Sequence, residues 1–369
     1  MSSTCAIIAH WKTPEDTLAC LERLWVMDPG PDRIVVADNG SGDGSGERLL
    51  ARARERLGPS QTVAAGPAEP VEPRSRGEVH VEGNPSAHTL QVRPPSPQRG
   101  APGVQPSPVP GARIPAFTLL ALAENRGYAG AVNAAVRLAM AQGAPDFFLI
   151  LNSDAMAHQN ALTAFLACAA ARPGVGIFGA TILKGQADSA PEVLECAGGC
   201  RYLHWATMTR PNLAGLDLID ALEREEPLID YVHGACMFAR REVFDTAGLF
   251  DERFFLFCEE LDFCLRAKSL GFGLGWCREA RVVHAGGASL KAGFPDARER
   301  KLVANYHENL GALMIARQWA GAAFPLAVSW RFFGKLAVLA ARRETYLAAA
   351  LFAACKRFFF GGAGPSAPR

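Results

Sequence analysis

Short apolar runs alternate with helical patterns in the first part of the chain. The run "TCAIIAHW" has the length and flanks of a buried strand. The next stretch, "TPEDTLACLERLW", predicts a helix, because Thr13 is a favourable N-cap and Pro14 fits the first helical position. A second strand over residues 33–37 ends in Asp38, Asn39 and a glycine-rich turn. This alternation is typical of an α/β fold with a mostly parallel sheet.

The same pattern resumes after residue 115. The stretch "AFTLLALAENRGYAGAVNAAVRLAMAQG" predicts a strand, a polar turn and a helix that ends near Gly143. "DFFLILNSDA" predicts another buried strand, and "ALTAFLACAAARPG" the helix after it. These strands end in acidic or amide side chains, and open α/β sheets bind ligands at that edge. Beyond Gly174 the pattern is more β-like, and the last 70 residues are Ala-rich and helical.

One segment has a different composition. The residues from Pro59 to Pro115 include 13 of the 25 prolines and no Phe, Trp or Tyr. Such a segment cannot bury enough apolar surface to offset the entropy of ordering it. We therefore predict a domain over residues 1–292 that is interrupted by a disordered insertion over 58–115, and a helical extension over 293–369.

Composition and charge exclude some classes of protein. The 369 residues are 49% hydrophobic, enough to bury a sizeable core. The formal charge of +1 and the pI near 7.6 give no general attraction to nucleic acid. The ten cysteines form no C-x-x-C motif, and no signal-peptide h-region opens the sequence. We expect reduced thiols and a cytoplasmic protein.

The C-terminal stretch "WRFFGKLAVLAARRETYLAAALFAACKRFFF" mixes apolar and basic residues. Arg331, Lys335, Arg342 and Arg343 interrupt its apolar runs, so we do not expect it to span a membrane. The composition fits a helix lying on the inner face of the cell membrane with its basic groups at the headgroups. An ordinary packing helix with a solvated basic face fits equally well.

Polar residues after two strands are candidates for ligand binding. Asp38 at the first of these ends can accept hydrogen bonds from a nucleobase or ribose, although Asp-Asn-Gly is also a common turn. The glycines over residues 40–46 do not form the dinucleotide fingerprint G-x-G-x-x-G. In "LNSD", Asn152 and Asp154 have the spacing of joint ligands for Mg²⁺ or Mn²⁺, or of a turn that leads into the next helix. His284 before two glycines is either a metal ligand or a structural histidine.

Three carboxylates lie within four residues in "FFLFCEELDFCLR". A helix that begins near Glu259 places Glu259, Asp262 and Arg266 along one face, with Asp262 and Arg266 spaced as an ion pair. Glu260 points about 100° away and has no such partner. Apolar and acidic neighbours raise the pKa of Glu260 towards the value that a general base near neutral pH requires.

Five motifs in this order resemble a known family: "VVADNGSGDGS", "ENRGYAGAVN", "LILNSDA", "YVHGACMFARREVFDTAGLFDERFFLFCEELDFCLR" and "ARVVHAGGAS". Their order and spacing are similar to those of the family 2 glycosyltransferases of GT-A fold, above all the rhamnosyltransferase-type branch that builds bacterial surface polysaccharides. The resemblance covers Cys5 to about Leu290, apart from the proline-rich insertion. It implies a mostly parallel sheet flanked by helices.

The resemblance also implies roles for residues in the donor site. It implies that Asp38 and Asn39 contact the base and ribose of a nucleoside-diphosphate sugar. It further implies that the nucleotide pocket is lined by Asn125, Gly127 and Asn133.

The resemblance implies a metal site and a catalytic base. Asn152 and Asp154 match the D-x-D-type element that holds a divalent cation, Mg²⁺ or Mn²⁺, on the donor diphosphate, and His284 matches a histidine that completes this site. The first metal position is Asn rather than Asp, which removes one charge. The family's E-D-x-D is E-E-L-D here, so the identity of the base is open. The candidates are Glu260, Asp262 and Glu259.

The function implied is that of an inverting glycosyltransferase. It would move a sugar, best guessed as rhamnose, from its nucleotide donor to a hydroxyl of a glycan or lipid-linked acceptor. One alternative is a catalytically inactive module that binds nucleotide sugars or carbohydrates. Another is a sugar-phosphate nucleotidyltransferase, which needs a Gly-rich, basic phosphate loop near the N-terminus, and "AHWKTPED" is not such a loop.

Overall fold

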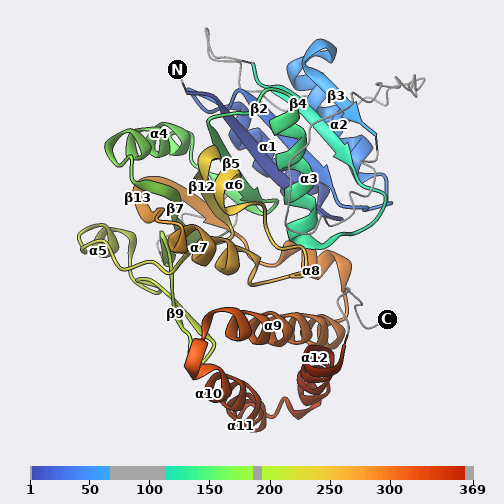
Figure 1. The fold of residues 1–369 in the computed structure, drawn as a ribbon. Coiled ribbons are helices and arrows are strands. Elements are labelled where there is room, and N and C mark those ends of the chain that lie inside the picture. The colour runs from blue at the N-terminus through green and yellow to red at the C-terminus, as the bar shows by residue number, and fades with distance from the viewer. Residues whose placement is uncertain (1, 67–113, 186–192, 362–369) are drawn as a thin grey trace.

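The computed structural model describes residues 2–66, 114–185 and 193–361. Within them, a ten-stranded mixed sheet forms the centre, in the order β3-β4-β2-β1-β5-β12-β7-β13-β6, with β8 paired to β7 (Figure 1). Its strands are β1 (Thr4–His10), β2 (Arg33–Asp38), β3 (Thr62–Ala65), β4 (Ala116–Ala121), β5 (Phe147–Asn152), β6 (Ala155–Ala157), β7 (Val175–Lys184), β8 (Leu194–Ala197), β12 (Cys236–Arg240) and β13 (Gly273–His284).

Helices cover this sheet and continue into the C-terminal part. The α-helices are α1 (Pro14–Trp25), α2 (Ser45–Leu57), α3 (Gly127–Ala141), α4 (Ala161–Ala171), α5 (Leu218–Leu222), α6 (Arg241–Ala247), α7 (Glu259–Ser269), α8 (Ala288–Gly293), α9 (Ala297–Trp319), α10 (Phe324–Ser329), α11 (Lys335–Ala341) and α12 (Ala348–Phe360). Helix α1 begins at Pro14 as predicted, and its apolar residues Cys20, Leu21 and Leu24 are buried. These side chains recur at helical spacing, which directs one face of α1 into the core.

The parallel half of the sheet aligns the strand ends that carry polar residues. Strands β3, β4, β2, β1 and β5 are parallel neighbours. His10 pairs with Asp38, and Ala9 with Asn152, so β1, β2 and β5 end at the same level. The sequence-based prediction of an α/β fold whose acidic and amide groups share one sheet edge is therefore confirmed.

A smaller sheet extends the fold towards the C-terminal helices. It contains β9 (Gly199–Leu203), β10 (Met208–Pro211) and β11 (Tyr231–Val232), in the order β10-β9-β11. The β9–β10 hairpin runs from the main sheet to the region of α10 (Figure 1). It thereby connects two parts of the molecule that are far apart in sequence.

The predicted insertion begins later than expected. Residues 59–66 are described, and they contain the 3-10 helix η1 (Pro59–Gln61) and strand β3, which pairs in parallel with β4. The prediction of disorder from residue 58 was wrong for these residues, because it weighed proline content and could not include pairing with β4. Most of the predicted insertion, residues 67–113, lies outside the described residues.

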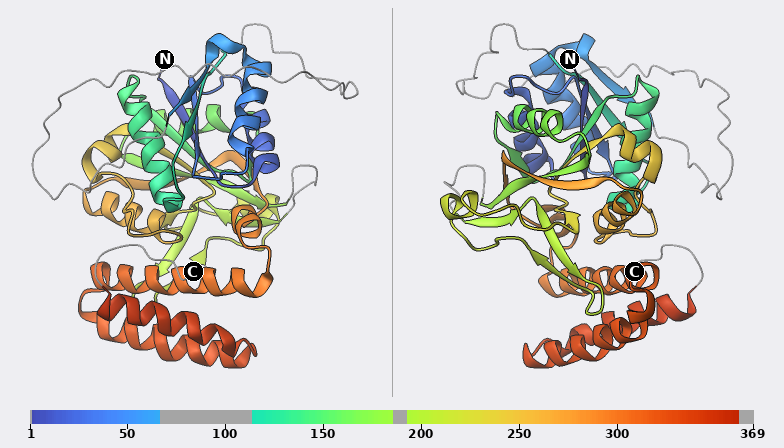
Figure 2. Two further views of the ribbon diagram at one scale, coloured as in Figure 1. Left: turned by 90° about the vertical axis from the view of Figure 1, so that its right-hand side faces the viewer. Right: turned by 60° about the vertical axis from the view of Figure 1, so that its left-hand side comes forward.

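The C-terminal helices form a separate layer below the sheet domain (Figure 2). Helices α9 and α12 pack together around Tyr306, Ala350 and Ala354, whereas Ile315 of α9 belongs to the main core. The 3-10 helix η2 (Gly321–Ala323) leads into α10, and the π-helix η3 (Trp330–Gly334) joins α10 to α11, which gives one helical stretch, Gly321–Ala341. The 3-10 helix η4 (Thr345–Leu347) leads into α12. By length and composition alone, Gly321–Ala341 could cross a membrane; its mean hydropathy is 1.3 and 17% of it is buried. The expectation that this part of the chain does not span a membrane stays a prediction, because length and composition alone do not decide it and Arg331 and Lys335 interrupt the stretch.

Candidate active site

Asp38 ends β2 at the carboxyl edge of the sheet. Its Oδ1 accepts a hydrogen bond from the Ser41 amide (3.1 Å), which closes the glycine-rich turn. A Cβ on Gly46 would lie 2.5 Å from the Asp38 Oδ2, so glycine is needed for the first turn of α2 to approach this carboxylate. Asp38 thus lies between the strand edge and the start of a helix, and its contact with a donor remains a prediction.

Asn39 holds a neighbouring loop in place. Its side chain is buried; the Nδ2 donates to the Asn125 Oδ1 (2.9 Å) and to the Gly127 carbonyl (3.1 Å). The Asn39 Oδ1 accepts from the Arg126 amide (2.9 Å). Both ends of the amide are engaged inside the protein, so we assign Asn39 to holding residues 125–127 and not to contacting the ribose.

The loop at Asn125 and Gly127 connects this edge to the segment before α7. The Asn125 Oδ1 also accepts from the Gly127 amide (2.9 Å). Gly127 has a φ of 72°, and a Cβ there would lie 2.3 Å from the Phe255 carbonyl oxygen. The Tyr128 amide donates to the same carbonyl (3.0 Å). Gly127 is therefore required for close backbone packing, which aligns this edge of the sheet with the segment before α7.

Asn133 has a structural position inside the protein. Its side chain is 1% exposed on α3. The Nδ2 donates to the Phe250 carbonyl and to the Glu252 carboxylate (2.9 Å each), and the Oδ1 accepts from the Phe250 amide (3.0 Å). The prediction that Asn133 lines the nucleotide pocket does not fit this geometry, because its hydrogen-bonding groups fix the segment around Phe250.

A turn and two paired strands bring Asp154 next to His284. Asn152 is the last residue of β5, and Asp154 lies in the turn before β6. Strand β6 pairs with the end of β13, which places the His284 Nε2 3.4 Å from the Asp154 Oδ1. The Ala288 amide donates to the Asp154 Oδ2 (3.1 Å). The structure thus brings together Asp154 and His284, two of the three residues predicted as metal ligands, and Asn152 lies two residues before Asp154 at the end of β5.

Glu195 adds a second carboxylate to this cluster. Its Oε2 lies 3.0 Å from the His284 Nδ1, so the imidazole is held between two acids. Burial opposes charge on His284, but the hydrogen bonds to Asp154 and Glu195 outweigh it and raise the pKa of His284 to about 9. Burial also opposes charge on both acids, yet the contact with His284 lowers the pKa of each. The three groups are therefore ionised together near neutral pH.

The residues present fit a divalent cation that takes most of its ligand atoms from a bound diphosphate and only one or two from the protein. Within the described residues, no three His, Cys, Asp or Glu side chains are arranged to hold a metal ion by themselves. A cation bound to a diphosphate needs only one or two protein ligands. Asp154 offers a carboxylate oxygen, and His284 can offer its Nε2 once it loses its proton. Glu195 on the Nδ1 would then orient that imidazole, as carboxylates do beside metal-bound histidines.

His233 connects this cluster to the carboxylates of α7. Its Nε2 lies 3.7 Å from the Glu195 Oε1, and burial lowers the pKa of His233 to about 4. It is therefore neutral, and its Nδ1 accepts from the Ala235 amide (3.2 Å). The next residue is Gly234, where an added Cβ would lie 3.4 Å from the Glu260 Oε1. The metal-site candidates and the base candidates therefore face one region of the molecule.

Glu259 and Glu260 begin helix α7, as the sequence predicted. The Oε2 atom of each is buried and has no hydrogen-bond partner among the described residues. Burial, and then the charge of Glu260, raises the pKa of Glu259 well above its usual range. Burial raises the pKa of Glu260 to about 6, although backbone amides of Glu260 and Leu261 oppose this. A carboxylate that titrates near neutral pH and has a free oxygen is suited to take a proton.

The backbone before α7 is strained. Phe257 and Cys258 have φ values of 67° and 69°, in the left-handed region that non-glycine residues seldom adopt. Two such residues in succession cost on the order of 1 to 3 kcal/mol each and cluster at functional sites in proteins. This strain fixes the direction in which α7 begins and hence the position of Glu259 and Glu260.

Asp262 is a structural residue. It is 1% exposed, and its Oδ2 accepts from the Arg266 Nε (2.7 Å), the ion pair predicted from the sequence. Its Oδ1 accepts from the Trp319 Nε1 of α9 (3.4 Å). Because both oxygens have partners, Asp262 is the weakest of the three candidates for the base.

Sequence reasoning missed Glu195 and His233. Glu195 occurs in "LECAGG", a stretch that was assigned only as β-like, and His233 lies inside a motif quoted for the resemblance. Neither has a local pattern that marks it, because both reach the site through the pairing of strands. A histidine directly before glycine in "YVHGAC" was the one available signal for His233.

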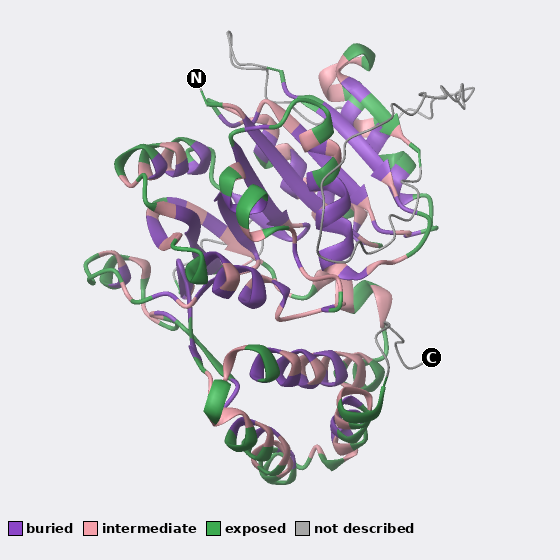
Figure 3. Cartoon of the chain, in the orientation of Figure 1, coloured by how far each residue is buried: buried purple, intermediate pink, exposed green. Residues whose placement is uncertain are grey.

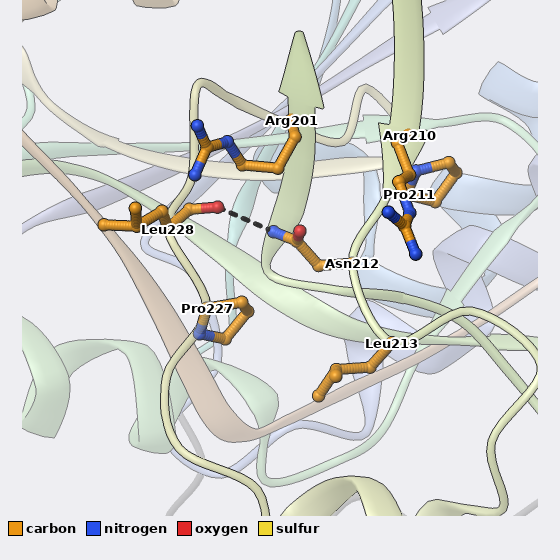
Figure 4. Close-up of a pocket in the computed structure, with 7 residues that line it drawn as sticks. All are labelled: Arg201, Arg210, Pro211, Asn212, Leu213, Pro227 and Leu228. Atoms are coloured by element: carbon orange, nitrogen blue, oxygen red, sulfur yellow. Dashed lines mark hydrogen bonds between the residues drawn. The ribbon is translucent and has the colours of Figure 1, made fainter.

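A shallow pocket of about 370 Å³ lies elsewhere, on the β9–β10 hairpin (Figure 4). Its walls include Arg201, Arg210, Asn212 and Leu228, with the Asn212 Nδ2 donating to the Leu228 carbonyl (3.1 Å). None of the predicted site residues lines this pocket. Its lining is mostly apolar and lacks a carboxylate, so it does not match the chemistry of the site described above.

The sequence of the chain matches one family model over the part that carries these clusters. The model of "Glycosyltransferase like family 2" matches residues 107–300, more than half of the chain. The protein therefore belongs to this family. The match includes the segments that carry Asp154, Glu195, Glu260 and His284.

Two relatives are similar to parts of the chain. N-acetylglucosaminyl-diphospho-decaprenol L-rhamnosyltransferase from Mycobacterium tuberculosis is 26% identical over 183 residues, 47% of this chain and 60% of that protein. Low-salt glycan biosynthesis hexosyltransferase Agl10 from Haloferax volcanii is 36% identical over 56 residues, 15% of this chain and 18% of that protein. The chain thus spans less than two thirds of the length of either relative.

A solved structure has a similar fold. Residues 1–349 of TarS from S. aureus, in complex with UDP-GlcNAc, align with a TM-score of 0.50 at 11% identity, over 96% of this chain and 80% of that one. At this identity the likeness concerns the fold alone. The predicted GT-A fold, with its mostly parallel central sheet and helical C-terminal part, is confirmed.

Proposed function

We propose that the protein is an inverting glycosyltransferase. It transfers a sugar, with rhamnose as the first candidate, from a nucleoside-diphosphate donor to a hydroxyl of a glycan or lipid-linked acceptor. The observation that carries the proposal is the arrangement of two unlike acid clusters on either side of the His233–Gly234 turn. In the cluster around His284, the two carboxylates are ionised and pair with the imidazole. In the cluster at the start of α7, Glu259 and Glu260 each have a buried carboxylate oxygen without a partner among the described residues. Family membership and the relatives' names support the choice of reaction.

Glu260 is assigned the role of general base. Its pKa of about 6 leaves it mostly ionised at neutral pH, whereas burial and the charge of Glu260 raise the pKa of Glu259 well above its usual range and favour its protonated form. Glu260 takes the proton from the acceptor hydroxyl as that oxygen attacks the anomeric carbon, and the bond from this carbon to the diphosphate breaks. One displacement of this kind inverts the configuration. The anionic surroundings favour the positive charge that develops on the sugar ring.

Asp154 and His284 are assigned to the diphosphate end of the donor. Asp154, with Asn152 beside it, and His284 would hold a divalent cation, which supplies positive charge that stabilises the leaving diphosphate. Glu195 keeps the His284 ring in position through its Nδ1. Asp38 at the end of β2 is assigned to the nucleoside, with the loop over residues 125–127 held beside it by Asn39.

The names of the relatives suggest an acceptor and a cellular location, and we propose both for this chain. The M. tuberculosis relative is named for a decaprenol-linked substrate. We propose a comparable lipid-linked or glycan acceptor for this chain, within the biosynthesis of a cell-envelope polysaccharide at the cytoplasmic face of the membrane.

A thermal-shift panel of dTDP-, UDP- and GDP-sugars, with and without Mn²⁺, tests the proposal. A ligand at 100 times its Kd stabilises the folded state by about 2.7 kcal/mol, which gives a clear rise in melting temperature. We expect one donor to stabilise the protein in a Mn²⁺-dependent way, and Asp154→Ala to remove that dependence. Binding without transfer to any acceptor would favour an inactive binding module. Release of diphosphate from a nucleoside triphosphate and a sugar phosphate would favour a nucleotidyltransferase.

A further inference from the structure

The helical stretch Gly321–Ala341 directs its charged groups towards the protein. Arg331 is 7% exposed, and its Nη2 lies 2.9 Å from the Glu308 Oε1. Its Nε donates to the Asn309 Oδ1 (2.7 Å), and its Nη1 to the Thr207 carbonyl of the β9–β10 hairpin (3.3 Å). This guanidinium therefore ties the stretch to both α9 and the hairpin.

The opposite side of the same stretch is apolar and faces outward. Leu326, Trp330 and Phe333 are 55%, 44% and 68% exposed. Their spacing of four and three residues places them on one face of the helix. A surface helix of a soluble protein normally buries its apolar face and exposes its charges. This helix does the reverse, so its outer side is adapted to an apolar environment.

Neighbouring elements extend this apolar surface. The ring centroids of Trp205 and Trp330 are 5.6 Å apart. The ring centroid of Phe332 lies 5.1 Å from that of Phe333 and 5.3 Å from that of Phe352. Helices α10 to α12 carry mostly exposed and intermediate residues (Figure 3). We define the outer face as the exposed side chains of Trp205, Leu326, Trp330, Phe333 and Phe352, which helical spacing or ring contacts link to one another.

The segments that carry the outer face concentrate the exposed apolar side chains of the molecule. Of the sixteen large hydrophobic side chains that are exposed in the described part of the chain, ten lie in the two segments that carry this face, residues 203–208 and 326–360. They include every Trp and Phe among the sixteen. A patch of this kind marks an interaction surface rather than ordinary solvent-exposed surface.

Positive charge accompanies the outer face. Residues 321–361 contain six basic residues and one acidic residue, although the whole chain carries a formal charge of only +1. Arg331 and Lys335 face Glu308, whereas Arg342, Arg343 and Lys356 are exposed. Exposed Trp and Phe side chains with basic residues beside them are typical of a surface that lies in the headgroup region of a bilayer.

We propose that the outer face binds the surface of an anionic lipid bilayer, with Gly321–Ala341 lying parallel to it. The stretch does not cross the bilayer, because insertion would break the bonds of Arg331 and leave it and Glu308 unpaired in hydrocarbon. A symmetric contact with a second copy would bring the same basic residues together and is disfavoured. The inference is independent of the proposed activity, since it rests on a different surface and its test measures lipid binding.

Vesicle flotation of the purified full chain tests the inference. We compare neutral phosphatidylcholine vesicles with vesicles that also contain phosphatidylglycerol, at low and high salt. We expect binding to the anionic vesicles that weakens at high salt. Replacing both Arg342 and Arg343 by Gln should lower the partition coefficient for the anionic vesicles by about 25-fold, because each basic residue contributes a factor of about five. Phe333→Asp combined with Phe352→Asp should lower it by about tenfold or more.

Ile219→Asp is the matched control, because Ile219 is 73% exposed but lies on α5 outside the outer face. It should bind vesicles as the wild type does, and circular dichroism should show that all variants are folded. Binding that is unchanged in the outer-face variants, or equally reduced by Ile219→Asp, would overturn the inference. No vesicle binding, together with a dimer that Phe333→Asp dissociates, would identify a second copy as the occupant instead. Transfer to a water-soluble acceptor, measured alongside, separates failure of this inference from failure of the proposed activity.

Discussion

Asp262 and Glu260 lie two residues apart on α7, yet their environments are opposite. Asp262 has a partner for each oxygen, Arg266 and Trp319. Glu260 has a buried oxygen with no partner among the described residues, and burial raises its pKa to about 6. A compensated carboxylate contributes stability, whereas an uncompensated one costs stability and is available to react. The comparison therefore separates a structural acid from a chemical one within a single turn of helix.

The largest expected effect concerns the uncompensated side of this comparison. Glu260→Gln should lower kcat by about 10² to 10⁴, the usual contribution of a positioned general base, because only the ability to take a proton is lost. Donor affinity should be kept, and the melting temperature at neutral pH should be equal or higher, because the variant removes an uncompensated buried charge. Steady-state transfer with the identified donor, together with donor Kd, measures this. Glu259→Gln is the matched variant and should lose much less, since the raised pKa of Glu259 favours its protonated form, which cannot accept a proton. A greater loss in Glu259→Gln would move the base to that residue.

Substitution of the compensated carboxylate, Asp262, should lower the stability of the protein and leave its turnover largely unchanged. Asp262→Asn leaves Arg266 without its carboxylate in a largely buried position, and we expect a loss of about 3 kcal/mol in the free energy of unfolding. Urea denaturation at pH 7 measures the loss, and kcat per folded molecule should change little. A collapse of turnover at unchanged stability would show that Asp262 and Glu260 have exchanged the roles assigned to them.

The third prediction concerns Glu195, a carboxylate that has a partner, as Asp262 does, but whose partner is the metal-ligand candidate His284. Glu195→Gln removes the carboxylate on the His284 Nδ1, and should weaken Mn²⁺-dependent donor binding by about 10- to 100-fold, as the loss of such outer partners does in metal sites. Calorimetric titration of donor at several Mn²⁺ concentrations measures this. Donor binding without metal should be the same in Glu195→Gln and the wild type. Equal metal dependence in the two proteins would remove Glu195 from the site.

The pH dependence sharpens the contrast further. The pKa of Glu260 rises on folding from an ordinary value of 4.5 to about 6, so the folded state holds this proton more tightly than the unfolded state. Its contribution to stability is fully present below pH 4.5 and is lost as the pH rises through 6, about 2 kcal/mol in all. Glu259 acts in the same direction. Urea denaturation at pH 5 and 7.5 should show a smaller decline in Glu260→Gln than in the wild type, whereas turnover of the wild type should rise over this range.

The smallest effect is expected outside both clusters. Replacing residues 67–113 by a Gly/Ser linker should change the free energy of unfolding by about 1 kcal/mol or less, since loop length affects stability only weakly. Because β3 and β4 are parallel, the linker must return along the whole strand, which requires a dozen or more residues. A linker of about 15 residues should preserve the melting temperature, and one of four residues should lower it. Loss of folding with the longer linker would contradict the idea of a dispensable insertion.

The sequence predicted much of the sheet domain because its signals are local. Pro14 at the start of α1, the strands that end at Asp38 and Asn152, and the start of α7 at Glu259 all follow from periodicity and end signals. Strand β3 was missed for the opposite reason. Four residues among prolines have no periodicity of their own, and their order comes from pairing with β4.

The candidate site was predicted residue by residue but not contact by contact. The pairing of Asp262 with Arg266 could be predicted, since it depends only on helical spacing. The roles of Asn39 and Asn133 could not, because their hydrogen-bond partners lie 86 or more residues away. Glu195 was missed because it reaches His284 only through the pairing of β8 and β13 with β7.

The sequence by itself determined the order of strands and helices, the family, and the chemical types of the groups at the sheet edge. Tertiary structure decided which of these groups are compensated, because burial and partners depend on chain segments brought together by the sheet. It also decided that Arg331 faces inward while Trp330 faces outward, although both lie in one apolar-basic stretch. A pKa or an exposed face is a property of the surroundings of a residue, and those surroundings exist only in the folded chain.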